Sequence, residues 1–425
     1  MGTYQISAEL HNFCRTFEKD LTKPQMNRLK ELIHGIIRGK KAILSEVARQ
    51  NRGKQNKTIR KQVQQYSDML LKLPLETMAI RKMAGLKGAV TAGTPLYFDL
   101  VDITKKYHRG MERIGNTWNG SEGIPGRGYE MVDVSLGLER GGMTLFRHLY
   151  STENLDYGSQ VKEIEKVLQT MISAWGEMRG TAFVDSGGDN NRLIELFLRY
   201  EMGFAIRMNV NRGAMDRVVF DERGDRMKMM ELWGETQGVT AWHDAGKKKR
   251  KLVRLQWRRV FMDRKNPVPL WLVRAHREGD PDPCVFLTSR TITDSSEAAR
   301  VYEQYFQRGG KEEAVFKCHK DKLGMEKVRL CSFEKTKQLM LIYVLADQFL
   351  AGLHEQALQA GHLLYTFLTA FVQGTQRKIT KWAIIDFYDH AWSILERDFL
   401  LFKNRFRPPD GAYRLPLFFN LNEKW

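Results

Sequence analysis

The sequence has few cysteines, and their spacing forms no recognisable pattern. Cys14, Cys284, Cys318 and Cys331 are scattered along the chain without a CxxC pair. This spacing indicates neither a zinc site nor a disulfide framework. Unpaired, scattered cysteines are typical of proteins that remain in a reducing cytoplasm.

The sequence also lacks a long hydrophobic run. Its most apolar stretch, Leu339–Leu353, contains Asp347 and is shorter than the ~20 residues that a bilayer-spanning helix needs. The N-terminal residues do not have the pattern of a signal peptide. We therefore expect a cytoplasmic protein that has no membrane partner.

Acidic residues are outnumbered by basic ones. The chain has 68 Lys and Arg against 50 Asp and Glu among 425 residues, a formal net charge of +18. A chain of this length can bury a substantial core, and we expect two or three domains. A folded protein with this charge favours a polyanion, usually nucleic acid; an anionic membrane surface is the competing partner.

Two apolar stretches of similar design each carry an aspartate. Thr94–Lys105 has the pattern of a strand, and Asp99 lies inside its apolar run, where a carboxylate is costly unless its charge is compensated. A bound divalent cation would provide that compensation, whereas a solvent-facing aspartate is the simpler interpretation of Asp99 alone. A second strand, Thr181–Asp185, repeats the design, and an acidic pair, Glu312 and Glu313, follows far downstream.

Taken in order, these segments resemble the motif blocks of the DDE transposases of bacterial insertion sequences. Residues 99–105 are similar to the first-Asp motif, and residues 183–207 to the second-Asp block. Residues 305–326 resemble the Tyr–Arg–Glu–Lys signature of the branch that has a long β insertion before its Glu. The resemblance covers roughly residues 90 to 335.

The resemblance implies an α/β fold with a ribonuclease-H-like catalytic domain. The order of strands and helices expected from the pattern between residues 90 and 210, three strands and then helix, strand, helix and strand, agrees with it. The predicted ranges are a helical DNA-binding domain at 1–85, the first part of the catalytic domain at 90–210, a β-rich insertion at 211–292, the helix with the third acidic residue at 293–335, and C-terminal helices at 336–425.

The N-terminal range has three helical segments, and the unit they form is predicted to be helix-turn-helix-like. They are centred on Leu29–Ile37, Glu46–Arg49 and Ile59–Leu70. The alternative is a helical bundle with an ordinary solvated basic face, and the resemblance favours DNA binding. The basic flank consists of Arg38, Lys40, Lys41, Arg49, Arg52, Lys54, Lys57, Arg60 and Lys61.

The insertion range is predicted to carry a basic hairpin tip at Gly246–Lys251. A solvated charge run is the more common interpretation of such a segment, although phosphate contact is plausible on a β insertion. Trp257 and Trp271 are expected to be core residues, with stacking on an unpaired base as the alternative.

The resemblance implies that Asp99, Asp185 and Glu313 bind two Mg²⁺ ions, with Mn²⁺ as a substitute, through the hard oxygen ligands that this metal prefers. Such a site needs no histidine base, and His319 is interpreted as an incidental helix residue. The predicted phosphate contacts are Lys105, Arg207, Tyr305, Arg308 and Lys320, although a core position is nearly as good an interpretation of Tyr305.

The identity of the third acidic residue depends on spacing. The family pattern places its Arg four residues before its Glu, and its Glu seven before its Lys, so Arg308 indicates Glu312 whereas Lys320 indicates Glu313. We expect Gly309 and Gly310 to interrupt the helix and to absorb the extra residue. We therefore favour Glu313 and keep Glu312 as the alternative.

The resulting hypothesis is a cut-and-paste transposase in the bacterial nucleoid that acts on transposon ends and target DNA as a homodimer. The apolar C-terminal segments Leu339–Leu353, Leu363–Val372 and Trp382–Phe399 are candidates for packing on the catalytic domain or on a second subunit. The alternatives are a nuclease or resolvase that lacks strand transfer and a DNA-binding repressor with an inactive site.

Overall fold

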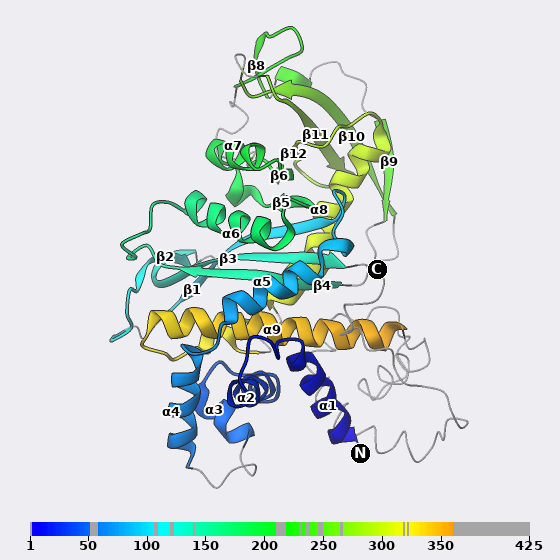
Figure 1. Ribbon diagram of the computed structural model, residues 1–425. Helices are drawn as coiled ribbons and strands as arrows, with labels where there is room; N and C mark the ends of the chain where they lie inside the picture. Colours follow the sequence, from blue (N-terminus) through cyan, green and yellow to red (C-terminus); the bar gives the residue numbers. More distant parts are fainter. Residues whose placement is uncertain are drawn as a thin grey trace, which may run out of the picture. The chain divides into compact units, whose positions relative to one another are not determined.

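The computed structural model is a mixed α/β structure with a large mixed sheet (Figure 1). It describes residues 2–51, 58–105, 109–119, 123–138, 141–209, 218–229, 231–233, 239–244, 250–263, 267–317, 319–320 and 323–359. The chain divides into two compact units. Unit 1 comprises Met1–Ala89, Val101–Gly158 and Gly310–Trp425, and unit 2 comprises Val90–Leu100 and Ser159–Gly309.

Unit 2 is built on three neighbouring parallel strands. The first half of β1 (Pro95–Thr104) pairs with β5 (Thr181–Val184), and β5 pairs with β6 (Gly203–Arg207). Antiparallel strands then extend the sheet from β6. They are β12 (Cys284–Thr288), β11 (Pro269–Arg277), β10 (Arg250–Phe261), β9 (Val239–Asp244), β7 (Val218–Phe220) and β8 (Arg226–Lys228).

Side-chain caps set the start of two helices in unit 2. The Ser159 side chain accepts a hydrogen bond from the third residue of its helix, α6 (Gln160–Trp175), which ends at Gly176 in the left-handed conformation. The Asn190 side chain caps α7 (Asn191–Arg199), which connects the parallel strands β5 and β6. These crossovers bring the carboxyl ends of β1, β5 and β6 to one edge of the sheet.

The core of unit 2 lies between the sheet and α8 (Ser295–Lys317). Tyr97, Phe183 and Ala205 come from the three parallel strands, and Val301 and Tyr305 come from α8. Trp257 and Trp271 are partly buried and pack against the same cluster, which agrees with the prediction that they contribute to the core.

Helix α8 continues through Gly309 and Gly310 to Lys317, so the predicted interruption of the helix at these glycines is wrong. Each glycine lowers helix propensity by about 1 kcal/mol relative to alanine, and such a penalty is routinely overridden by tertiary packing. The buried side chains of Val301, Tyr302 and Tyr305 provide that packing.

Unit 1 contains an antiparallel set of strands covered by helices. In it β3 (Ile124–Leu138) pairs with β2 (Gly115–Asn119) and β4 (Gly141–Tyr150), and it neighbours the second half of β1. A Cβ atom at Gly128 would lie 2.3 Å from the Ile103 carbonyl oxygen, so this position of β3 requires glycine.

The long helix α9 (Phe333–Gln359) packs on β4 and is contacted by N-terminal helices. The predicted helical segments at 29–37, 46–49 and 59–70 are confirmed. The N-terminal helices are α1 (Gly2–Arg15), α2 (Lys23–Gly39), α3 (Leu44–Gln50), α4 (Ile59–Leu70) and α5 (Leu75–Gly85). Short 3-10 helices cover Lys87–Ala89, Ser186–Gly188, Glu231–Trp233 and Met325–Lys327.

Within the described ranges, no helix combines the length and the apolar character needed to cross a bilayer. Of the predicted C-terminal helices, Leu339–Leu353 lies inside α9, whereas 363–372 and 382–399 lie outside the described residues.

Candidate active site at the ends of β1, β5 and β6

The strand register places three of the predicted site residues at neighbouring positions on adjacent strands. Phe98 on β1 is paired with Val184 on β5, which is paired with Ile206 on β6. The next residues along these strands are Asp99, Asp185 and Arg207. Since side chains alternate along a strand, these three lie on the face of Tyr97, Phe183 and Ala205, which is the face that packs against α8.

Arg308 on α8 joins the two aspartates. Its Nη2 atom donates a hydrogen bond of 3.0 Å to Asp99 Oδ1, and its Nη1 atom lies 3.7 Å from Asp185 Oδ2. The predicted convergence of Asp99 and Asp185 is therefore present in the structure, although their sequence positions are far apart. The guanidinium compensates both carboxylates in this arrangement.

Arg207 and Tyr305 form the second part of the site. Their side chains are hydrogen-bonded, and Asp185 lies close enough to Arg207 to interact with its charge. Burial raises the pKa of the Tyr305 hydroxyl, and the hydrogen bond from Arg207 opposes this shift. Burial also acts to lower the pKa of Arg207, but Cys284, Tyr305 and Asp185 together raise it.

The two aspartates differ in their access to water. The exposed fraction of the side chain is 17% for Asp99 and 42% for Asp185, against 10% for Arg308. The Asp185 carboxylate also accepts a hydrogen bond of 2.9 Å from the Gly187 amide, which orients it. Two oriented carboxylates on one face suit a hard cation such as Mg²⁺, provided that Arg308 gives up its place between them.

No group of three or more His, Cys, Asp or Glu side chains suited to a metal ion is found in the part of the chain that the structure describes. The side chains of Glu312 and Glu313 lie outside that part, whereas their main chain belongs to α8. In an unbroken helix position 312 lies one turn after Arg308 on the same face, and position 313 is rotated by a further 100°.

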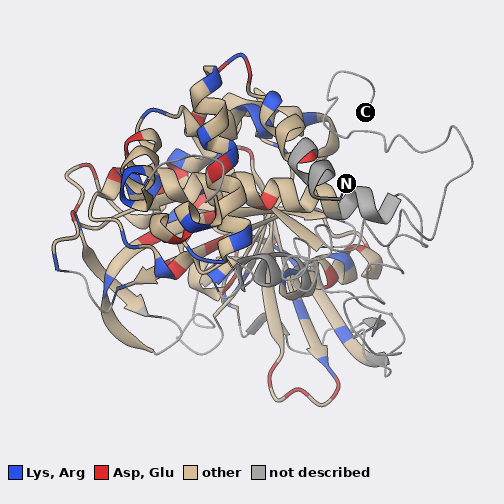
Figure 2. Ribbon diagram, turned by 90° about the horizontal axis from the view of Figure 1, so that it is seen from below, with Lys and Arg blue, Asp and Glu red and all other residues tan. Residues whose placement is uncertain are grey.

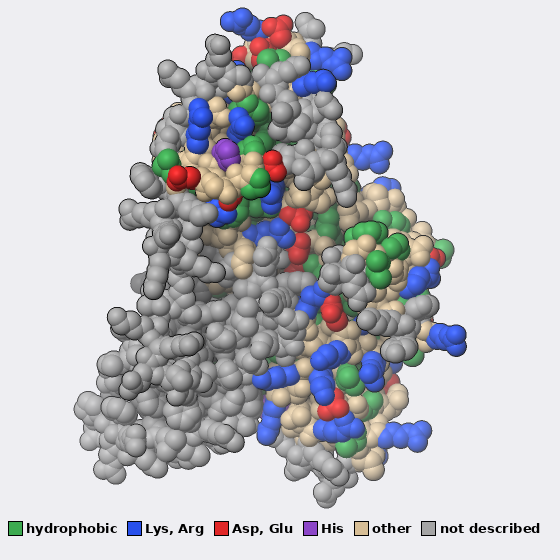
Figure 3. Space-filling model, turned by 180° about the vertical axis from the view of Figure 1, so that it is seen from behind, with side chains coloured by type: hydrophobic (Ala, Val, Ile, Leu, Met, Phe, Trp, Pro, Cys, Tyr) green, Lys and Arg blue, Asp and Glu red, His purple; other side chains and the backbone are tan. Residues whose placement is uncertain are grey.

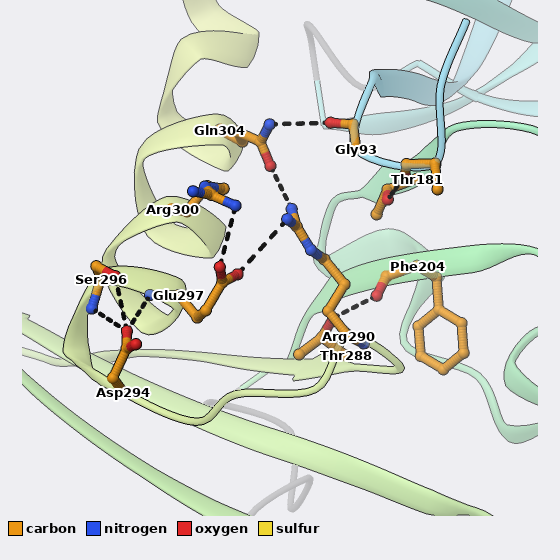
Figure 4. Close-up of polar contacts among 11 residues, drawn as sticks. Gly93, Thr181, Phe204, Thr288, Arg290, Asp294, Ser296, Glu297, Arg300 and Gln304 are labelled. Carbon is orange, nitrogen blue, oxygen red and sulfur yellow. Dashed lines mark hydrogen bonds and ion pairs between the residues drawn. The ribbon is translucent and has the colours of Figure 1, made fainter.

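Polar contacts hold α8 against the start of β1 (Figure 4). Gln304 donates a hydrogen bond of 3.2 Å to the Gly93 carbonyl and accepts one of 2.6 Å from Arg290. The Tyr97 hydroxyl donates to the Gln304 carbonyl at 3.0 Å. Arg290 also lies 3.8 Å from Glu297. Because Gln304 precedes Arg308 by one helical turn, these contacts fix the helix face that carries Arg308.

Lys105 and Lys320, which were predicted to contact phosphate, share a different partner. Lys105 is buried, and its Nζ atom donates to the carbonyls of Glu326 at 2.6 Å and Val328 at 3.2 Å. Burial lowers the pKa of Lys105 to about 8, and Glu326 opposes the shift. Lys320 Nζ lies 2.5 Å from the Glu326 carboxylate. Both lysines therefore engage the segment 326–328.

The predicted DNA-binding helices present exposed basic side chains. A Cβ atom at Gly35 would lie 2.5 Å from Val47, so α2 and α3 cross closely. Figure 2 shows basic positions on several of these helices, and in Figure 3 basic side chains gather over the part where α3 and α4 lie. Arg38, Lys40, Lys41, Arg49, Arg60 and Lys61 are exposed, and Arg52, Lys54 and Lys57 lie outside the described residues.

A second basic surface lies on β10 and β11. Since Val253 and Leu255 point into the core, Arg254, Gln256 and Arg258 lie on the opposite face of β10. On β11, Arg274 donates a hydrogen bond of 3.1 Å to Gln256, and its pKa is lowered by burial and by the nearby Arg254. Of the predicted basic tip, residues 246–249 lie outside the described residues.

Sequence reasoning missed Gln304, Arg290 and Glu326. Gln304 has a weak signal, because it precedes Arg308 by four residues and so shares its helix face, whereas Arg290 precedes α8 and has none. Glu326 has no such signal, because its contact with Lys105 joins positions 221 residues apart.

A scan against models of known protein families gives no match to this chain. A search of curated proteins gives no significant match either.

Proposed function

We propose that the protein is a cut-and-paste DNA transposase that cleaves the ends of an insertion sequence and joins them to target DNA. The observation that carries this proposal is the convergence of Asp99 and Asp185 on neighbouring parallel strands, with Arg207 and Arg308 beside them. Such a pair of carboxylates with adjacent cations suits metal-assisted phosphoryl transfer.

The order of elements supports a ribonuclease-H-like catalytic domain. The first aspartate is on β1. Three strands, β2, β3 and β4, follow and pair antiparallel with one another, and the second aspartate comes directly after β5, which follows helix α6. Helix α7 and strand β6 come next, and a series of antiparallel strands then precedes α8. Apart from β2, a short strand that was not predicted, this is the order that the resemblance implies, with the β-rich insertion between the second aspartate and the third acidic residue.

In the proposed reaction Asp99, Asp185 and an acidic residue of α8 hold Mg²⁺. When bound, the metal supplies a lowered pKa for the attacking hydroxyl and charge neutralisation at the leaving oxygen. Arg308 and Arg207 bind the oxygens of the phosphate at the cleavage position, and the Tyr305 hydroxyl orients Arg207. No protein nucleophile is needed, because positioning and charge neutralisation are most of what phosphoryl transfer requires.

We propose Glu312 as the third acidic residue. The preference for Glu313 rested on the spacing to Lys320 and on an expected break of the helix at Gly309 and Gly310, and α8 is unbroken. Position 312 shares the helix face of Arg308, the residue that contacts both aspartates. We expect Glu312→Gln to lower the rate of strand cleavage by at least about 10³-fold and Glu313→Gln by less than about tenfold. The opposite order would restore Glu313.

Assembly and location follow from the same proposal. Each chain carries one pair of aspartates, and two transposon ends require two sites, so we expect a homodimer that holds two end duplexes. The net charge of +18 disfavours the approach of two chains without DNA. The proposed location is the bacterial cytoplasm, in association with the nucleoid.

Cleavage of a labelled duplex tests the function. The duplex carries the sequence that flanks the gene of this protein in its genome, and a supercoiled plasmid serves as target DNA. We expect nicking, double-strand cleavage and joining to the plasmid with Mg²⁺ or Mn²⁺. Cleavage without joining would favour a nuclease or resolvase, and binding without cleavage would favour a repressor.

Conservative variants connect that activity to the site. Asp99→Asn and Asp185→Asn are expected to abolish cleavage and to leave the Kd for end DNA within about threefold. Glu195→Gln, a change at an exposed position of α7, is the matched control. An active Asp99→Asn variant, or one with a lowered melting temperature and normal metal affinity, would assign Asp99 a structural role.

A further inference from the structure

A group of charged side chains is fully buried in unit 1, and the proposed reaction does not use it. Asp133 on β3 and Arg147 on β4 are cross-strand partners, with Arg147 Nη2 2.6 Å from Asp133 Oδ2. Their side chains are 1% and 0% exposed. His319, which follows α8, and Asp347 on α9 complete the group, and both side chains are 0% exposed. His319, interpreted from the sequence as an incidental helix residue, is therefore a core residue.

The contacts define the hydrogen-bonding state of the His319 ring. Arg147 Nη2 lies 2.9 Å from His319 Nδ1, and since a guanidinium only donates, Nδ1 is the acceptor. The ring proton is therefore on Nε2, which lies 3.0 Å from Asp347 Oδ1 but has no hydrogen-bond partner in the described part of the chain. The other oxygen of Asp347 accepts a hydrogen bond of 2.7 Å from the Thr144 amide of β4.

Stability alone is a poor explanation for this group. Asp133 Oδ1 and Arg147 Nε have no hydrogen-bond partner in the described part of the chain. Buried ion pairs with incomplete partners contribute little net stability compared with apolar residues of similar size. They do fix the relative positions of the segments that supply them, because any other arrangement leaves a buried charge uncompensated. Here the segments are β3, β4, the residues after α8, and α9.

The segment that His319 anchors follows directly on the helix with the third acidic residue. His319 comes two residues after the end of α8 and is followed by Lys320, which pairs with Glu326. Arg147 also reaches this segment, with Nη1 3.1 Å from the Met325 sulfur. The Tyr343 hydroxyl of α9 donates to the Leu323 carbonyl at 2.8 Å. Contacts of His319, Lys320, Leu323 and Met325 thus hold the segment after α8, and the contact of the imidazole is the one nearest to α8.

We propose that His319 is a positioning residue, which fixes the end of α8 and with it the acidic residue at 312 or 313. This inference rests on the proposed function, because it assigns His319 a part in arranging that site. His319 does not touch DNA or metal in this proposal. Arg147 of β4 and Asp347 of α9 hold the His319 ring, and the ring in turn fixes the position of the end of α8.

Two amide substitutions separate the two contacts of the ring. The amide oxygen of asparagine is placed like Nδ1, so His319→Asn retains an acceptor for Arg147. The amide of glutamine is placed like Nε2, so His319→Gln retains a donor toward Asp347 and loses the acceptor. Because Nδ1 is hydrogen-bonded to Arg147 and Nε2 has no hydrogen-bond partner in the described part of the chain, we expect asparagine to substitute better than glutamine. His319→Ala removes both contacts.

The test measures single-turnover cleavage with Mg²⁺, the Kd for end DNA, and hydrogen exchange of the amides of residues 310–320. We expect His319→Ala to lower the cleavage rate at least 30-fold, to change the Kd less than threefold, and to accelerate exchange in 310–320 at least tenfold. His319→Asn is expected to recover both values to within about fivefold of the unchanged protein. Met171→Ala, at a buried position of α6, is the control for general loss of stability.

The outcomes are distinct. A His319→Ala protein that loses cleavage only as far as Met171→Ala does, with unchanged exchange in 310–320, overturns the proposal. Equal behaviour of the asparagine and alanine variants overturns it as well. If the unchanged protein cleaves no DNA, the proposed function fails. The exchange measurement still decides whether His319 fixes the helix end.

Discussion

Two of the arginine–aspartate arrangements in the described part of the chain differ mainly in their exposure to water. In unit 2, Arg308 lies between Asp99 and Asp185, and the Asp185 side chain is 42% exposed. In unit 1, Arg147 contacts Asp133, and neither side chain is more than 1% exposed. The residue types are the same in both, so residue type alone does not distinguish a candidate active site from a structural contact.

Burial makes the difference because it decides which partners a carboxylate has. Asp133 has no access to water, and its charge depends on Arg147. Asp185 has solvent and the Gly187 amide besides Arg308, so it can exchange the guanidinium for another cation or for a ligand. A site for chemistry needs this exchange, whereas a fixed junction between segments is better without it. Each of the following predictions tests one side of this comparison.

The largest difference is expected in stability. Arg147→Ala leaves Asp133 uncompensated in a dry interior and should lower the free energy of unfolding by about 3–5 kcal/mol. Arg308→Ala should lower it by about 1 kcal/mol, because water solvates the aspartates it leaves. Urea denaturation of both variants measures the difference. Asp133→Leu combined with Arg147→Met is the control and should recover much of the loss. Equal losses of unfolding free energy in Arg147→Ala and Arg308→Ala would show that burial does not distinguish the two arrangements.

Lys105 extends the buried side of the comparison to pH dependence. Its pKa is about 8 in the folded protein and near its ordinary value of 10.5 in the unfolded chain. The unfolded chain therefore binds more protons between these values, and stability rises as pH increases from about 8 to 10.5. We subtract the free energy of unfolding of Lys105→Met from that of the unchanged protein, and expect this difference to rise by about 3 kcal/mol from pH 8 to pH 10.5. A flat or falling difference would show that the Lys105 ammonium is solvated.

The smallest of these effects concerns cation binding to the more exposed arrangement, Asp99 and Asp185 with Arg308. If Arg308 occupies the place of a metal ion, Arg308→Gln should tighten binding of Mn²⁺ to the DNA-free protein by about tenfold, or 1.4 kcal/mol. Titration calorimetry measures this directly. Arg300→Gln, two turns earlier on α8 and paired with Glu297, is the control and should change nothing. Weaker binding by Arg308→Gln would mean that the guanidinium holds the carboxylates in their binding positions.

The strands of the candidate site were predictable from the sequence, and so were Asp99 and Asp185. Each aspartate ends or interrupts an apolar run, and this local pattern survives in the fold. The alignment with Arg207 requires the pairing of Val184 with Ile206, which is a property of three strands together. No local pattern contains it.

The helix α8 and the residues after it were predicted less well, for two physical reasons. The Gly309–Gly310 pair indicates a break by propensity alone, but packing of the preceding turns overrides it. His319 and Lys105 look like ordinary polar residues, because the carbonyl and guanidinium groups they contact are 172 to 223 residues away in the chain. Contacts of this range depend on the whole fold, and a single sequence does not reveal them.

The contact between Arg308 and Asp99 joins positions 209 residues apart, and this has a consequence for the protein during its synthesis. At a translation rate of about 5–20 residues per second, the ribosome needs roughly 10–40 s to add Arg308 after Asp99. During that time β1 and β5 can emerge and pair while neither aspartate has its guanidinium partner. In a nascent chain stalled before α8, the pairing of β1 and β5 should therefore be unstable. Unit 2 should become protease-resistant only after α8 has left the exit tunnel.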